Sequence, residues 1–220
     1  ARKETVYDAI VIGSGISGGW AAKELCEKGL KTLVLERGRI VEHVVDYPTM
    51  NLDPWDMELR GGLTPEEQEK HYKNIRSGWV GKDTEHFWAD DAANPYTEKK
   101  PFLWLRGHQM GGRSLLWGKQ TYRWSDLDFK ANAKDGNGVD WPIRYKDIKP
   151  WYTYVEKFAG ISGEALNLPQ LPDSHFLPPM EMNCVEKHIK GRIEKEFSDR
   201  NMIIGRCAHL TQPHNGRGQC

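Results

Sequence analysis

The sequence predicts an α/β fold that opens with a Rossmann-like βαβ unit and continues into the start of an α+β domain. An apolar run, Val6 to Ile12, leads into a glycine-rich turn at 13–18 and then into an alanine-rich helical stretch. A second apolar run, Thr32 to Leu35, ends on the acidic Glu36. Strand, glycine turn, helix, strand and acid follow one another in the order of the dinucleotide-binding fingerprint.

Each glycine of the turn has a physical role in this prediction. Gly13 permits the tight turn that leaves the first strand, and Gly15 lets the backbone approach a pyrophosphate because it has no Cβ. Gly18 lets the helix lie close to the strand. The pyrophosphate is expected on the free N–H groups of the helix N-terminus, with Ser14 in the same turn. Glu36 is placed to accept hydrogen bonds from ribose hydroxyls, and its charge disfavours the 2′-phosphate of NADP.

Composition gives no reason to expect several classes of partner. The 31 basic and 31 acidic residues cancel, so bulk charge favours neither nucleic acid nor an anionic membrane as a partner. No stretch approaches the ~20 apolar residues of a transmembrane helix. The four cysteines have no CxxC spacing, so we expect neither a disulfide scaffold nor a metal site. No signal peptide precedes Val6, although the chain opens without a methionine, and we leave the compartment open.

Residues 39–100 are predicted to form an irregular, tryptophan-rich insertion. One short helix is expected at 65–76, where Thr64 can cap the helix and Pro65 suits its first turn. A long irregular segment is often functional or covers a site. The alternative is a solvated insertion anchored by a few buried tryptophans.

Residues 101–124 combine glycines with aromatic residues and arginines. The diglycine Gly111-Gly112 suits close approach of the backbone to a bulky planar ligand. The alternative is a turn followed by the start of a buried helix.

Regular structure is expected again in the last third of the chain. A polar loop at 125–142 leads into a helix from about 146 to 160, and a second helix is expected at about 183–198. The apolar residues of the first of these helices form one stripe: Ile148, Trp151, Val155 and Phe158. Residues 202–204 are a candidate short strand.

Three blocks of sequence, in this order, resemble the N-terminal half of glucose–methanol–choline (GMC) oxidoreductases. They are the fingerprint with Leu35-Glu36-Arg37-Gly38, then Gly111-Gly112-Arg113-Ser114 with Trp117-Gly118, and then Trp141-Pro142-Ile143, Tyr145, Pro150-Trp151-Tyr152 and Gly160-Ile161-Ser162-Gly163. Together they cover about half the chain. The resemblance is closest to the bacterial sugar- and polyol-oxidising branch, which includes gluconate dehydrogenase-like flavoproteins and pyranose oxidase.

The resemblance implies FAD as the bound dinucleotide. It places one set of residues at the pyrophosphate, Glu36 at the adenosine ribose, the diglycine with Ser114 on the pyrophosphate–flavin side, and Trp117 and Gly118 near the isoalloxazine. Arg37 is also expected to be a cofactor-binding residue. The implied pyrophosphate residues are Gly13, Ser14, Gly15, Ile16 and Gly18. For Trp117, the alternative is a core aromatic residue.

The resemblance also implies how FAD is held and which parts lie elsewhere. Pyranose oxidases carry a flavin-linking histidine where this chain has Leu116, so we expect non-covalent FAD. The histidine that serves the family as catalytic base lies near the family's C-terminus, and no block here corresponds to it. We therefore expect this chain to be the N-terminal portion, incomplete relative to the family, and we name no catalytic residue.

The expected division has three parts: 1–38 and 101–124 form the FAD-binding domain, 39–100 form the insertion, and 125–220 begin the substrate-binding domain. The expected function is oxidation of a CH–OH group of a sugar, glycoside or polyol by hydride transfer to flavin N5. Expected partners are this small-molecule substrate, an electron-acceptor subunit or the missing C-terminal portion, in a bacterial cytoplasm or periplasm.

Two other readings stay open. One is a reductase that shares only the fingerprint and is linked to FAD or NAD. Its redox members are expected to carry a CxxC near the flavin, and this sequence has none. The other reading is a non-catalytic or truncated dinucleotide-binding module of a larger redox complex.

Overall fold

The computed structural model describes residues 5–220 and divides into two compact units. The first unit runs to Trp117 and the second from Gly118 to Cys220. The three-part domain division expected from the sequence stays a prediction.

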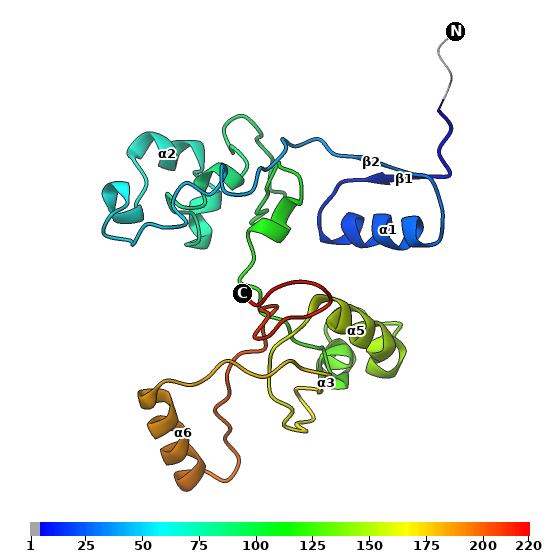
Figure 1. The fold of residues 1–220 in the computed structure, drawn as a ribbon, viewed down its shortest axis with the longest axis vertical. Helices are drawn as coiled ribbons and strands as arrows, with labels where there is room; N and C mark the ends of the chain where they lie inside the picture. Colours follow the sequence, from blue (N-terminus) through cyan, green and yellow to red (C-terminus); the bar gives the residue numbers. More distant parts are fainter. Residues whose placement is uncertain (1–4) are drawn as a thin grey trace. The chain divides into compact units, whose positions relative to one another are not determined.

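The first unit opens with the predicted βαβ arrangement (Figure 1). Strand β1 (Ala9–Ile12), helix α1 (Ile16–Glu27) and strand β2 (Thr32–Leu35) follow in order, and the two strands pair in parallel. Ala9 lies opposite Thr32, and the register continues to Ile12 opposite Leu35. The described residues are therefore compatible with the predicted α/β class, and β1 is shorter than the apolar run from which it was predicted.

In the strand pair, the buried side chains lie on the face that α1 covers. Val11 is 8% exposed, whereas its neighbours Ile10 and Ile12 are 61% and 85% exposed. Because side chains alternate between the two faces of a strand, β1 buries one face and leaves the other accessible.

The rest of the first unit consists of loops and single turns. Its elements are the 3₁₀ turns η1 (Glu58–Gly61), η2 (Asn74–Ser77), η3 (Glu85–Phe87) and η4 (Gly112–Leu115), with helix α2 (Pro65–Lys70).

Helix α2 begins as predicted but ends six residues early. Thr64 forms a capping box with Glu67 at the start of the helix. The expected end at residue 76 is wrong because the Asp91 carboxylate accepts the backbone N–H groups of Lys73 and Asn74 at 3.0 and 2.8 Å. These N–H groups are therefore not available to continue the helical ladder.

The insertion buries fewer tryptophans than the alternative of a segment anchored by a few buried tryptophans predicts. Trp88 is 7% exposed and packs in the local core with Phe87, but Trp55 and Trp79 are 70% and 77% exposed. One of these three tryptophans therefore anchors the segment, and polar groups fill much of the remaining interior.

The second unit contains the four remaining helices. They are α3 (Asp126–Phe129), α4 (Ala131–Asp135), α5 (Tyr145–Ala159) and α6 (Cys184–Glu196). The two long helices confirm the prediction to within two residues at each end. The polar loop expected at 125–142 is wrong, because Ser125 caps α3 in a capping box with Asp128.

No strand forms at 202–204 among the described residues, which corrects that prediction. Instead, Cys207 forms isolated bridges with Gln120 and Ser162.

Helix α5 buries a polar face rather than its apolar stripe. Trp151 is 65% exposed, whereas Glu156 is 4% exposed. Arg123, also 4% exposed, donates from Nε to the Glu156 carboxylate at 3.0 Å and from Nη1 to Tyr145 at 2.9 Å. A buried ion pair therefore joins the start of this unit to α5.

None of the helices in residues 5–220 combines the length and apolar character needed to cross a membrane. Within the same residues, no three His, Cys, Asp or Glu side chains gather where they could hold a metal ion.

Candidate functional site

The glycine-rich turn connects β1 to α1 by a close backbone contact. Gly13 has φ +89°, which glycine adopts without steric cost, and its N–H donates to the Leu35 carbonyl at 2.7 Å. A Cβ on Gly18 would lie 1.9 Å from the Gly13 carbonyl oxygen. The first turn of α1 therefore rests directly on the end of the strand, as the fingerprint predicts.

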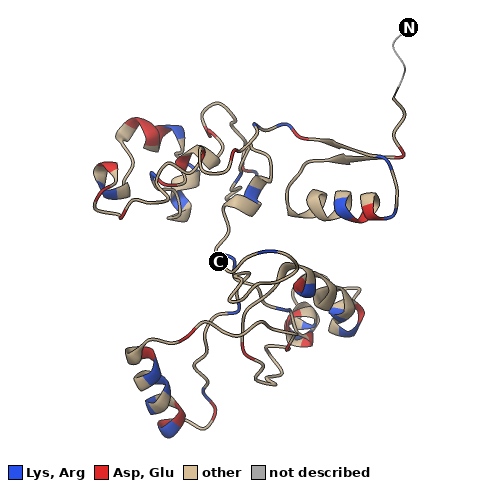
Figure 2. Ribbon diagram, viewed as in Figure 1, with Lys and Arg blue, Asp and Glu red and all other residues tan. Residues whose placement is uncertain are grey.

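The N-terminus of α1 is open to an anion. Gly15 is its N-cap and no side chain caps the helix, so its first N–H groups keep their hydrogen-bonding capacity. The first turn carries no acidic residue, and Figure 2 shows the charged residues of α1 only in its later turns. The positive end of the helix dipole therefore faces this turn with no carboxylate in the first turn of the helix itself.

Ser14 and Glu36 form a hydrogen-bonded pair between the turn and the end of β2. The Ser14 N–H and hydroxyl both donate to Glu36 Oε2, at 2.8 and 2.6 Å, and the Gly38 N–H donates to Oε1 at 2.8 Å. The hydroxyl bond and then the backbone bonds lower the pKa of Glu36 to about 2. Glu36 is therefore ionised at neutral pH and held in one orientation.

The diglycine segment lies against the same turn, although the two are 97 residues apart in sequence. The Gly111 N–H donates to Ser14 Oγ at 2.9 Å, and Ser114 Oγ donates to the Gly111 carbonyl at 2.6 Å. A Cβ on Gly112 would lie 3.6 Å from the Gly15 Cα. Two glycine loops thus form one cradle, with Ser14 at its centre.

Two residues that we did not assign also build this cradle. A Cβ on Gly38 would lie 2.5 Å from the Gln109 Cα. Only glycine at position 38 therefore lets the backbone after Glu36 pack against Gln109. Gln109 is 2% exposed and its side chain donates to the Gly112 carbonyl at 3.1 Å. Gly38 belongs to the block that contains Glu36 and could have been assigned from the sequence, but no motif in this sequence predicts a role for Gln109.

A pocket of about 460 Å³, here called the glycine pocket, opens on the cradle. Its lining residues are Ile12, Gly13, Gly15, Ile16, Ser17, Gly18, Arg113, Ser114 and Trp117. Trp117 is 40% exposed, so the alternative that it is a core aromatic residue does not hold in this structure. Free N–H groups, absence of acid and the Arg113 guanidinium together fit the pyrophosphate of a dinucleotide.

The other predicted residues lie outside the lining of the glycine pocket. Ser14, Glu36, Gly111 and Gly112 hold its loops together. Gly118 is the first residue of the second unit.

Arg37 lines a second pocket of about 580 Å³, which we call the basic pocket. Its lining residues are Arg37, Asn94, Pro95, Trp104, Leu105, Arg106, Gly107, His108 and Arg113. The pKa of His108 is lowered by burial and then by the charges of Arg37 and Arg106, while Glu36 opposes this effect.

Other histidines have structural contacts. His71 is fully buried with Nδ1 3.3 Å from the Ala89 carbonyl oxygen, and His214 Nε2 lies 2.6 Å from the Lys157 carbonyl oxygen. Neither lines the two pockets described above.

Comparison with known proteins places the chain beside several oxidases and dehydrogenases. It is 29% identical to 6'''-hydroxyparomomycin C oxidase of Streptomyces lividus over 73% of this chain and 24% of that protein. It is 24% identical to the fructose dehydrogenase large subunit of Gluconobacter japonicus over 97% of this chain and 38% of that protein.

A third relative is the gluconate 2-dehydrogenase flavoprotein of Pantoea cypripedii, 29% identical over 72% of this chain and 26% of that protein. No family model matches the chain. The chain thus spans between 24 and 38% of the length of these three relatives.

Proposed function

Because the homologues of this chain are GMC oxidoreductases, matched over their N-terminal portion, we propose that it is the FAD-binding portion of an oxidoreductase acting on the CH–OH group of a sugar, glycoside or polyol. The observation that carries the proposal is the cradle itself. The glycine turn, the acid after β2 and the diglycine segment come from distant parts of the sequence and are hydrogen-bonded through Ser14.

Each part of the cradle has a role in holding the cofactor. The N–H groups at the start of α1 bind the pyrophosphate, with Arg113 adding a positive charge from the opposite loop. Glu36, ionised and fixed by Ser14, accepts hydrogen bonds from ribose hydroxyls. Ser114 and Trp117 line the same pocket and contact the flavin side of the cofactor.

The chemistry follows from the cofactor class. When bound, FAD supplies a hydride acceptor at flavin N5 for the carbon of the alcohol. The residues of this chain bind and orient that acceptor. Leu116 has a hydrocarbon side chain that cannot bond to the flavin at the position of the flavin-linking histidine of pyranose oxidases, and this supports a cofactor held without a covalent link.

The substrate and partner classes are taken from the relatives. Their names include fructose, gluconate and paromamine, and one is called a large subunit. We therefore place this chain's activity on a sugar or polyol, with an electron-acceptor subunit as partner.

Two matched variants test the proposal. Gly15 has φ −65°, and a Cβ there would meet its nearest atom at 4.0 Å, so Gly15→Ala leaves the fold intact but puts a methyl group where the pyrophosphate approaches. Gly19→Ala adds a methyl group to the same helix, 3.9 Å from its nearest atom and outside the glycine pocket. FAD titration followed by flavin fluorescence should show binding weakened about tenfold in Gly15→Ala alone, the loss expected for impaired charge-assisted bonds.

A panel of sugars and polyols with an artificial electron acceptor then tests the activity on the full-length protein, because no block of this chain corresponds to the family's catalytic histidine. Equal FAD affinity in both variants would contradict the proposed site. FAD binding without oxidation of any sugar or polyol would instead favour the non-catalytic module.

A further inference from the structure

The basic pocket concentrates positive charge without a carboxylate in its lining. Three arginines and one histidine contribute to its wall, and the remaining lining residues are uncharged. Trp104 adds an aromatic surface that is 51% exposed.

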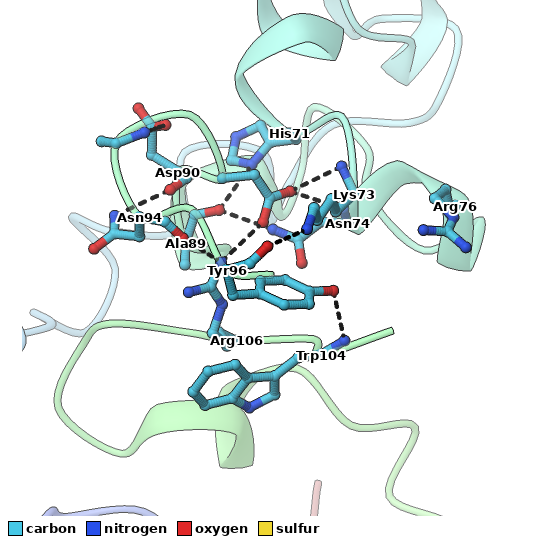
Figure 3. A network of polar contacts seen from close by, with 12 residues as sticks. His71, Lys73, Asn74, Arg76, Ala89, Asp90, Asn94, Tyr96, Trp104 and Arg106 are labelled. Carbon is cyan, nitrogen blue, oxygen red and sulfur yellow. Dashed lines mark hydrogen bonds and ion pairs between the residues drawn. The ribbon is translucent and has the colours of Figure 1, made fainter. Parts of the chain in front are cut away.

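Arg106 is fixed in this wall by a buried network (Figure 3). Its Nη2 donates to Asp91 Oδ1 at 3.1 Å and to the Asn94 carbonyl at 2.7 Å, and Asp91 is fully buried. The guanidinium carbon lies 5.0 Å from the ring centres of both Tyr96 and Trp104. Arg106 is 9% exposed, yet its Nε has no hydrogen-bond partner among the described residues. A buried donor without a partner indicates a missing acceptor.

The other two arginines of the basic pocket, Arg37 and Arg113, have no acidic partner among the described residues. Among residues 5–220, the side chains of Arg37 and Arg113 form no ion pair. His108 lies in the same wall, where burial and then the charges of Arg37 and Arg106 lower its pKa. Unpaired guanidinium groups that converge on one cavity are suited to bidentate binding of an oxyanion.

We propose that the basic pocket binds a phosphate-type oxyanion carried by a small molecule other than the flavin cofactor. The proposed pyrophosphate position is the start of α1, and no residue of the glycine turn lines the basic pocket. The two pockets share Arg113 alone. A volume of about 580 Å³ accommodates a small molecule beyond the oxyanion, with Trp104 available to stack against a ring.

Isothermal titration with inorganic phosphate at constant ionic strength tests this site on the purified protein, with and without saturating FAD. We expect saturable binding in both conditions. Arg37→Gln should weaken phosphate binding about tenfold, because it removes hydrogen bonds to a charged group. Arg37→Lys, which keeps the charge but not the planar fork, should weaken it less. Arg113 is left unchanged because it also lines the glycine pocket. Arg192→Gln, on the exposed face of α6, is the control and should change nothing.

Arg106 is left intact in this experiment because its loss would strand the buried Asp91 carboxylate. Far-ultraviolet circular dichroism confirms that each variant is folded. Absence of saturable phosphate binding would overturn the proposal, as would equal affinity in Arg37→Gln and Arg192→Gln. Loss of phosphate binding when FAD is added would also overturn it, because the basic pocket would then hold the cofactor's own phosphates. The FAD titration of Gly15→Ala reports separately on the proposed function.

Discussion

Replacing Ser14 by alanine tests the hydrogen-bonded centre of the cradle. The substitution removes the 2.6 Å hydroxyl bond to Glu36 and the acceptor of the Gly111 N–H, while the Ser14 and Gly38 N–H groups still hold the carboxylate. A hydrogen bond to a charged group contributes about 1.5–3 kcal/mol. Glu36 is only partly buried, so we expect a loss of about 2 kcal/mol in the free energy of unfolding at pH 7.

The stability difference between wild type and Ser14→Ala should depend on pH in a defined direction. The folded pKa of Glu36, about 2, lies below its ordinary value of 4.5. A depressed carboxyl pKa stabilises the folded state fully above 4.5, and this stabilisation is lost as the pH falls towards about 2. The stability gap between wild type and Ser14→Ala should therefore narrow over that window.

Urea unfolding at a series of pH values measures the gap. Ser17→Ala is the matched control, because Ser17 lies in the same turn but its exposed hydroxyl makes no hydrogen bond among the described residues. Its effect should stay within about 0.5 kcal/mol. Equal stability of the two variants at pH 7, or a gap that does not change on acidification, would refute the reasoning.

Further predictions concern packing and buried charge. Gly18→Ala should lower the melting temperature sharply, because its Cβ would lie 1.9 Å from a backbone oxygen, whereas Gly19→Ala meets nothing closer than 3.9 Å and should be neutral or stabilising. A folded Gly18→Ala protein with an unchanged melting temperature would contradict the close approach. In the second unit, Glu156→Gln should cost about 3–5 kcal/mol in urea unfolding because it leaves buried Arg123 without a counter-charge, while the exposed Glu194→Gln should cost little. Similar losses in these two variants would argue against a buried pair.

The βαβ unit could be predicted because its signals are local. Glycine spacing, two apolar runs and a terminal acid all lie within 31 residues, from Val6 to Glu36, and each follows from the geometry of one turn. The capping box of α3, Ser125 with Asp128, was equally local and could have been recognised.

Other features depend on residues far apart in the sequence. Helix α2 ends where it does because Asp91, 17 residues beyond Asn74, takes its backbone donors. The basic pocket joins Arg37 to Arg106 and Arg113, and no spacing rule relates these positions. The position of Glu36 was predictable from the fingerprint, but its bond to Ser14 required the fold.

Retention of FAD by the purified protein tests the central claim most directly. An absorption spectrum is recorded on the protein and then on the supernatant after acid precipitation. We predict flavin bands at about 370 and 450 nm that move entirely into the supernatant, because the cofactor is bound in the cradle without a covalent link. A colourless protein that also fails to take up added FAD would contradict the FAD assignment, and flavin absorbance retained in the precipitate would contradict non-covalent binding.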